Sequence, residues 1–397
     1  MLGYITASGG IEYLCALNNR RTMRKLQMVD LSTQYAHIRE AVDAGIDEVI
    51  QTTQFINGSA TREFAVELAE YLGVRHVIPC GNGTDALQIA LMALGLEEGD
   101  EVITVPFTFV ATVEVVALLK GKPVFVDIDP STFNIDVRAI EAKITPRTKA
   151  IIPVHLFGQS ANMAPIMALA QQHGITVIED NAQAIGGTYT FPDGRTAKTG
   201  TMGHIATTSF YPTKNLGGYG DGGALFTQDD TLAQKIRIIC DHGSARKYFY
   251  DAIGVNSRLD SMQAAILRVK LQHLDTYNQQ RRSAADQYDT LLKDIPGITI
   301  PVRSPNATHV FHQYTIRVRE HRDALKDHLQ SLGIPSMIYY PVPLHMSDAY
   351  RWYGYASGDF PVSEQIAGEV LSLPMHTELD AEQISLVCEA ISRFMNR

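Results

Sequence analysis

Short apolar segments alternate with helical segments between residues 76 and 180, and this alternation constrains the fold more than any other feature of the chain. The predicted strands are residues 76–79, 101–105, 123–127, 150–154 and 176–180, and the predicted helices between them are residues 85–94, 111–119, 137–142 and 163–173. Strands separated by helices are typical of a parallel or mixed sheet that is covered on both faces. The pattern therefore predicts an α/β domain around a large sheet.

The flanking segments add helices and a second α+β region. Helical periodicity covers residues 29–50 and 61–72, and a long helix is predicted from residue 260 to about 279, with a continuation to 292. Strands near residue 298 and at 312–318 and helices at 322–332 and 381–395 follow. We predict an N-terminal tail at residues 1–22 with Met23 as the true start, a helical segment at 23–59, a large domain at 60–272 and a small domain at 273–397.

The composition limits the possible partners and location. A net charge of −9 argues against a nucleic-acid binder that relies on a basic surface. No apolar run approaches the ~20 residues needed to cross a bilayer, and the first basic residues follow the N-terminal apolar stretch, which is the wrong order for a signal peptide. The four cysteines, Cys15, Cys80, Cys240 and Cys388, lack metal-binding spacing. We therefore expect free thiols, no metal site and a cytoplasmic location.

A glycine-rich connection carries the lysine that suggests chemistry. Residues 209–218 read SFYPTKNLGG and lie between two predicted strands, at 205–210 and 224–227. Glycine lets the backbone approach a ligand closely. Lys214, which lies near Ser209 and a glycine run, therefore indicates a phosphate site or a lysine that forms a Schiff base. The alternative is a solvated loop lysine, so the rest of the chain must supply the other parts of a site.

Groups at other strand ends could supply those parts, because ligands of open α/β sheets bind beyond the carboxyl ends of the strands. Gly83 and Thr84 open a helix whose free N–H groups favour an anion, although Thr84 could be only an N-cap. Asp180 ends a buried strand, where an acid needs a cationic partner such as a protonated ring nitrogen, unless it caps a helix. Gln183 could reach an adjacent hydroxyl. Phe109 could stack on a planar cofactor or pack in the core.

Together these groups match the requirements of pyridoxal 5'-phosphate (PLP), which needs a lysine, an acid for its ring nitrogen, a phosphate cradle and a stacking residue. The segments GNGTDALQIAL, VPFTFVAT, FVDIDPSTFNID, PVHLFGQ, IEDNAQAIG, SFYPTKNLGGYGDGG and GVNSRLDSMQAAIL resemble the nucleotide-sugar aminotransferases of the DegT/DnrJ/StrS type. The resemblance runs from about residue 29 to the C-terminus. It implies a fold-type I PLP transferase with a large mixed-sheet α/β/α domain and a smaller α+β C-terminal domain.

The resemblance also implies a role for each matching residue. Lys214 would form the Schiff base and then shuttle protons, and Asp180 would hold the pyridine nitrogen protonated. Gln183 would contact the ring hydroxyl and Phe109 would stack on the ring. The phosphate would be bound by Gly83, Thr84 and Ser209, and by Asn256 from the neighbouring subunit of a homodimer. His204, where relatives often carry an acid, departs from the family pattern; it precedes a strand, so we expect little effect on the chemistry.

Four further residues are candidates for substrate contact. Arg258 lies two residues from Asn256, and its planar fork suits a carboxylate or a phosphate; a surface salt bridge is the alternative. Tyr339, Tyr340 and His345 match a segment that lies at the substrate mouth in relatives, and core packing of the tyrosines is the alternative.

The implied reaction is transfer of an amino group from an amino acid, with glutamate as the expected donor, to the keto group of a nucleotide-linked sugar through the pyridoxamine form of the cofactor. Within the family, the chain looks most like enzymes that aminate a UDP-2-acetamido-3-ketohexuronic acid for lipopolysaccharide or a related surface polysaccharide. One alternative is a sugar dehydratase of the same family, in which a histidine replaces the Schiff-base lysine; Lys214 argues against it. The other is a cofactor-binding regulator without turnover, against which the full set of catalytic groups argues.

Overall fold

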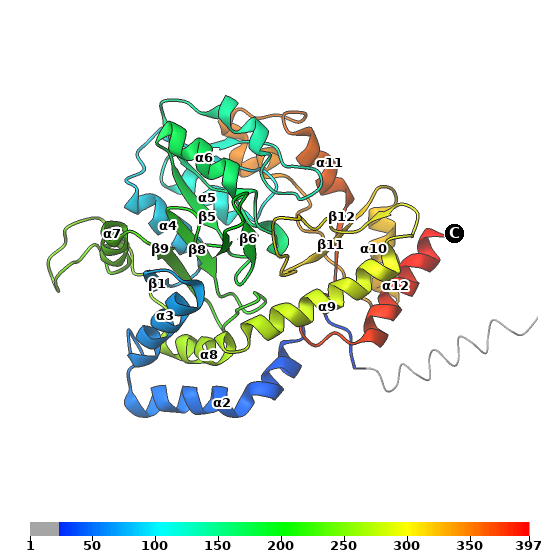
Figure 1. The fold of residues 1–397 in the computed structure, drawn as a ribbon, viewed down its shortest axis with the longest axis horizontal. Coiled ribbons are helices and arrows are strands. Elements are labelled where there is room, and N and C mark those ends of the chain that lie inside the picture. Colours follow the sequence, from blue (N-terminus) through cyan, green and yellow to red (C-terminus); the bar gives the residue numbers. More distant parts are fainter. Residues whose placement is uncertain (1–23, 397) are drawn as a thin grey trace, which may run out of the picture.

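The computed structural model describes residues 24–396, so the predicted tail at 1–22 and the predicted start at Met23 lie outside the described residues. A seven-stranded sheet in the order β1-β9-β8-β5-β4-β2-β3 forms the centre of the molecule (Figure 1). Its strands are β1 (His76–Cys80), β2 (Glu101–Thr104), β3 (Lys122–Phe125), β4 (Thr148–Ile151), β5 (Thr176–Asp180), β8 (Ile205–Ser209) and β9 (Gly223–Thr227).

The sheet is mixed, as the sequence predicts. Strands β3, β2, β4, β5 and β8 pair in parallel, whereas β9 pairs antiparallel to both β8 and β1. A short connection suffices for the antiparallel β8–β9 pair, and this connection is the glycine-rich segment that carries Lys214. The carboxyl ends of β2, β4, β5 and β8 therefore lie along one edge of the sheet.

Helices cover both faces of the sheet because neighbouring residues of each strand point to opposite sides. Val102 and Ile178 pack with α4 (Gly83–Ala93), α5 (Ala111–Leu118) and α7 (Asp230–Cys240). Ile103 and Val177 are the sequence neighbours of those two residues, and they pack with α6 (Met163–His173) on the other face. On that second face, α3 (Ser59–Leu72) and α8 (Ser261–Leu271) cover the β1, β8 and β9 end of the sheet. Helix α2 (Leu31–Thr52) packs outside α8 (Figure 1).

A three-stranded antiparallel sheet organises the C-terminal part of the chain. Its order is β10 (Ile298–Thr299), β11 (Tyr314–Val318) and β12 (Val370–Leu373). Three helices, α9 (Leu274–Leu292), α10 (Arg322–Ser331) and α12 (Ala381–Met395), close a separate apolar core on it, which also takes in Leu26. The sequence did not predict α11 (Pro361–Glu369), β12 or the β6–β7 hairpin (Thr188–Thr190 and Thr196–Lys198).

Two predicted helices were wrong in detail. The helix predicted at 137–142 is instead two short 3-10 helices, Val137–Ala139 and Glu141–Lys143. Only Ile140 is buried between residues 137 and 142, so this segment has no apolar face that would hold a longer helix against the core. The predicted long helix breaks at Gln272 and His273 into α8 and α9, since α8 packs on α2 and α3 while α9 packs on α12. The domain boundary at 272/273 stays a prediction, and it falls at this break.

Three further features concern membrane-spanning helices, metal-binding clusters and the cysteines. No helix within residues 24–396 combines the length and the apolar character needed to cross a bilayer. Within the same residues, no group of three or more His, Cys, Asp or Glu side chains is placed to hold a metal ion. Cys80, Cys240 and Cys388 are buried free thiols, and Cys15 lies outside the described residues.

Candidate active site

The edge formed by the carboxyl ends of the parallel strands brings together groups that are far apart in the sequence. Asp180 is the last residue of β5, and Ser209 is the last residue of the adjacent β8. Lys214 lies on the connection after β8, and Phe109 lies on the connection between β2 and α5. Gly83 and Thr84 form the first turn of α4.

The connection that carries Lys214 is held in a fixed shape. The amide of Phe210 donates to the Gly222 carbonyl at 2.7 Å and the amide of Gly218 donates to the Phe210 carbonyl at 2.8 Å, so both ends of the loop are closed. Asn215 is buried, and its side-chain amide donates to Asn278 at 2.7 Å on α9. These contacts place the neighbouring Lys214 at a defined point beside the sheet edge.

The surroundings of Lys214 favour a neutral amine. Burial lowers the pKa of Lys214 from its usual 10.5 to about 8, against the opposing effect of the Asp180 carboxylate. His312 is buried beside this lysine; burial and the charges of Lys214 and Arg281 hold the pKa of His312 well below its usual range. A neutral imidazole adds no second positive charge next to Lys214. The sequence analysis did not single out His312, which precedes β11 in the chain.

Asp180 is nearly buried, and its carboxylate is bound by neutral donors. The Thr112 hydroxyl donates to Oδ2 at 2.8 Å, and the Ala182 amide donates to Oδ1 at 3.2 Å. A turn rather than a helix follows Asp180, so the helix-capping alternative was wrong. No local pattern marks Thr112, because its contact with Asp180 spans 68 residues of the chain.

The start of α4 packs tightly against the end of β8. A Cβ atom on Gly83 would lie 2.7 Å from the Cβ of Ser209, so only glycine fits at this position without a shift. The N-cap of α4 is Asn82, whose side chain accepts from the Asp85 amide at 2.8 Å. Thr84 is therefore not the N-cap, which was the alternative to its role in anion binding. The free N–H groups of the first turn of α4 therefore lie against Ser209, and we call this point the candidate phosphate cradle.

Aromatic side chains make up another part of the candidate site. Phe109 is 53% exposed, so core packing, the alternative for this ring, was wrong. Its centroid lies 6.3 Å from the Tyr340 ring. Gln183 donates to the Tyr340 hydroxyl at 3.2 Å and accepts from the Phe157 amide at 2.7 Å, which fixes its orientation. Tyr339 is half-buried next to Tyr340. The predicted cofactor and substrate-mouth residues Phe109, Gln183 and Tyr340 thus lie together.

Two histidines take structural partners. His204 Nδ1 accepts from the Val177 amide at 3.0 Å and supports β5 from outside the site. His345 is buried, and its ring interacts with Glu364 at 3.0 Å and packs edge-on against Phe360. A substrate could reach the His345 ring only if the surrounding segment moved.

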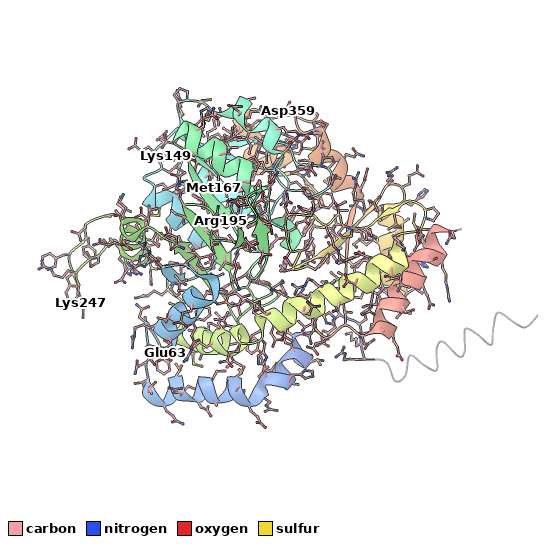
Figure 2. The ribbon with its side chains drawn as sticks, in the orientation of Figure 1. Glu63, Lys149, Met167, Arg195, Lys247 and Asp359 are labelled. Carbon is pink, nitrogen blue, oxygen red and sulfur yellow. The ribbon has the colours of Figure 1, made fainter. Side chains whose placement is uncertain are left out.

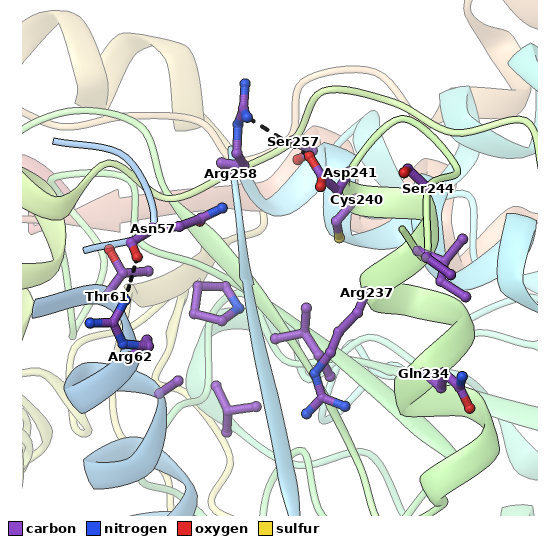
Figure 3. A pocket seen from close by; sticks show the side chains of 16 residues that line it. Asn57, Thr61, Arg62, Gln234, Arg237, Cys240, Asp241, Ser244, Ser257 and Arg258 are labelled. Atoms are coloured by element: carbon purple, nitrogen blue, oxygen red, sulfur yellow. Dashed lines mark hydrogen bonds and ion pairs between the residues drawn. The ribbon is translucent and has the colours of Figure 1, made fainter. Parts of the chain in front are cut away.

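Arg258 lines a pocket whose lining residues do not include Lys214, and Asn256 precedes it on the same segment. This pocket of about 720 Å³ lies between α3, β1 and α7, and Arg258 is among its lining residues (Figure 3). Arg258 lies 3.8 Å from the exposed carboxylate of Asp241, which is the surface ion pair that we considered as the alternative. Asn256 is exposed beside it. Between them, Ser257 accepts from the Gly81 amide at 2.9 Å, so this segment reaches the turn that precedes the α4 cradle.

The loop before Asn256 projects from the body of the molecule, with Lys247 at its far end (Figures 1 and 2). It exposes four large apolar side chains: Tyr248, Phe249, Tyr250 and Ile253, the last of them 88% exposed. We call this loop, residues 246–253, the aromatic arm. Exposed clusters of this kind mark protein interaction surfaces.

The chain is similar to known proteins over nearly its whole length. Residues 36–392 match the DegT/DnrJ/EryC1/StrS aminotransferase family. The chain is 50% identical to a pleiotropic regulatory protein of Geobacillus stearothermophilus, over 92% of this chain and 98% of that protein. It is 46% identical to the UDP-2-acetamido-2-deoxy-3-oxo-D-glucuronate aminotransferase of Pseudomonas aeruginosa, over 92% and 99%. The crystal structure of NtdA from Bacillus subtilis with bound cofactor PMP superimposes with a TM-score of 0.86 at 33% identity, over 94% of this chain and 86% of that one.

Proposed function

The chain belongs to the DegT/DnrJ/EryC1/StrS aminotransferase family, and from this premise we propose that it is a PLP-dependent enzyme that transfers an amino group to the keto group of a nucleotide-linked sugar. The observation that carries the proposal is the meeting of Lys214 and Asp180 at one sheet edge, where burial lowers the pKa of Lys214 to about 8. A solvated loop lysine would show no such shift. The bound PMP of a relative supports the choice of cofactor.

The residues at the sheet edge fit PLP. Asp180 is bound only by neutral donors among the described residues, so its charge is available to a cationic ring nitrogen. The close approach of Gly83 and Ser209 supports a phosphate cradle with Thr84. Phe109 presents an exposed ring that could stack on the cofactor. When bound, PLP supplies a carbonyl that reacts with amines and a ring that withdraws electrons.

Lys214 would hold the cofactor through its amine and then move a proton at the substrate carbon. A base works best when its pKa lies near the operating pH, and a pKa of about 8 meets that condition. His312 beside it is neutral and therefore adds no second positive charge next to the Lys214 amine. Gln183, held by Phe157 and Tyr340, would orient the ring hydroxyl.

We infer that the active unit is a homodimer. Asn256 follows the aromatic arm and is exposed, although the family resemblance assigns it to a cofactor phosphate. An arm with exposed tyrosines and a phenylalanine fits the core of a protein interface. Docking of the arm on a second copy would carry Asn256 and Arg258 into the partner's site.

The substrate class follows from the relatives and from Arg258. The 46% identical relative is named for a UDP-linked 3-oxo-glucuronate, and we propose a UDP-2-acetamido-3-keto-hexuronic acid as the substrate, glutamate as the donor and a surface polysaccharide as the destination of the product. A guanidinium fits a carboxylate in two-point geometry. Tyr339 and Tyr340 line the same mouth as Phe109 and could bond to the sugar or the diphosphate.

A two-stage absorbance experiment tests this function. Glutamate added to the PLP-loaded protein should convert the bound cofactor to its pyridoxamine form, and a nucleotide-linked 3-keto sugar should restore the first spectrum. A panel that varies the nucleotide and the C6 carboxylate identifies the substrate. Arg258→Lys should slow the sugar stage more than the glutamate stage. A spectrum that no amino donor changes would refute the proposal and favour a regulator, which is how one relative is named.

A further inference from the structure

Thr112 belongs to α5 but directs its hydroxyl away from that helix. Helical threonines commonly bond back to a carbonyl of their own helix. Here Oγ1 donates instead to Asp180 Oδ2 at 2.8 Å, at the end of a strand that is 68 residues further along the chain. The Thr112 side chain is completely buried, and Asp180 is 5% exposed, so water does not compete for this bond.

A second threonine extends the contact. The Thr108 and Thr112 hydroxyl oxygens lie 3.3 Å apart, and distance alone leaves the donor open. The chemistry of Asp180 decides it. An ionised carboxylate can only accept, so the single hydroxyl hydrogen of Thr112 is committed to Asp180. Thr108 must therefore donate to Thr112, and the hydrogen bonds run in one direction, Thr108 to Thr112 to Asp180. Bonds aligned in this way strengthen one another.

The main chain of Asp180 is already fixed by its neighbours. Its amide donates to the Pro153 carbonyl at 3.0 Å, and its carbonyl accepts from the His155 amide at 3.0 Å. What remains free is rotation of the side chain, and the torsion that turns the carboxylate plane is intrinsically broad. The Ala182 amide holds one oxygen, at the longer distance of 3.2 Å, and the Thr112 hydroxyl holds the other.

We propose that Thr112 is a positioning residue that, supported by Thr108, sets the orientation of the Asp180 carboxylate toward the ring nitrogen of the cofactor. The inference rests on the role proposed for Asp180 and extends it to a residue that itself touches no cofactor. A correctly aimed carboxylate favours the protonated nitrogen more than one that can rotate, because the strength of a charge-assisted hydrogen bond depends on its geometry.

Thr112→Val removes the hydroxyl and keeps the shape, and Thr112→Ser restores the hydroxyl. Thr104→Val is the matched control: Thr104 is equally buried on β2, and its hydroxyl donates to the Ile152 carbonyl at 2.9 Å rather than to Asp180. The readout is the ¹⁵N NMR shift of ¹⁵N-labelled PLP bound to each protein, which reports whether the ring nitrogen is protonated. The pH at which that proton is lost should fall by about one unit in Thr112→Val, a tenfold change in the equilibrium.

Thr112→Ser should return the ¹⁵N titration to the wild-type pH, and Thr104→Val should lower the melting temperature without moving the titration. If Thr112→Val does not fold, Thr108→Val tests the same hydrogen bonds from one step further away and should shift the titration in the same direction by less. A normal ¹⁵N titration in the folded Thr112 or Thr108 variant would overturn the inference and leave the threonines as packing residues.

Asp180→Asn separates this inference from the proposed function. If that variant also leaves the ring nitrogen protonated over the wild-type pH range, the role of Asp180 itself is wrong. If Asp180→Asn loses the proton and Thr112→Val does not, only the role of Thr112 is wrong. In the double variant Thr112→Val/Asp180→Asn, the threonine change should add nothing to the effect of the asparagine, since the two groups act as one unit.

Discussion

Replacing Lys214 with methionine should make the cofactor-free protein more stable, although it removes the amine that we propose holds the cofactor. In the free enzyme a protonated Lys214 is held in surroundings that disfavour its charge, and burial lowers its pKa from 10.5 to about 8. Methionine has a similar length and no charge, so it fills the same space without the desolvation cost. The Lys214 amine therefore lowers the free energy of unfolding of the cofactor-free protein.

The magnitude follows from the two pKa values. The difference between 10.5 and about 8, at 1.36 kcal/mol for each pH unit, corresponds to about 3 kcal/mol. The sign follows from proton binding. Between pH 8 and 10.5 the unfolded chain binds more protons at this lysine than the folded chain, so stability rises with pH through this range. The penalty is therefore present in full below about pH 8 and absent above about 10.5.

Urea unfolding of the cofactor-free protein at pH 7 and at pH 10, at one fixed protein concentration, measures this effect. Lys214→Met should gain about 3 kcal/mol at pH 7 and much less at pH 10. Lys270→Met is the matched comparison. Lys270 is buried on α8, and burial and the charge of Arg281 lower its pKa to about 8 as well. Its variant should be stabilised with and without PLP, since Lys270 lies outside the cofactor site.

Saturating PLP should reverse the order for Lys214 only. The wild type gains the free energy of cofactor binding, whereas Lys214→Met cannot link the cofactor covalently and gains less. Equal or lower stability of cofactor-free Lys214→Met at pH 7 would refute the reasoning, because it would mean that the amine is not penalised by its surroundings.

Three further predictions address the cofactor site and the assembly. Asp180→Asn should retain PLP but lose at least about a hundredfold in turnover, on the order of 3 kcal/mol in the barrier; an unchanged steady-state rate would assign the ring nitrogen to another partner. Gly83→Ala should weaken PLP binding about tenfold in an absorbance titration, because the added Cβ would lie 2.7 Å from the Cβ of Ser209; wild-type affinity would place the phosphate elsewhere. Lys214→Ala and Asn256→Ala, each inactive alone, should regain activity as mixed dimers, and no recovery after verified subunit exchange would mean that each site is built within one chain.

The sequence was sufficient for the elements whose signals are local. The short apolar strands, the end of α3 at Gly73 and the glycine-rich connection around Lys214 all depend on neighbours within a few residues. The mixed α/β sheet follows from such signals, because strand and helix alternate in chain order. Lys214, Asp180 and Gly83 could be named for the same reason, since Asp180 ends a predicted strand and the other two lie a few residues after one.

Only the tertiary structure decided which of these groups meet and how they are held. The pairing of β8 with β5 puts Ser209 and the Lys214 connection beside Asp180. Thr112 reaches Asp180, and His312 reaches Lys214, across long stretches of chain that carry no local pattern. The same holds for the break between α8 and α9, which is set by packing on different partners. Contacts of this kind depend on strand order, on the direction of side chains and on burial, and these are fixed only when distant segments pack together.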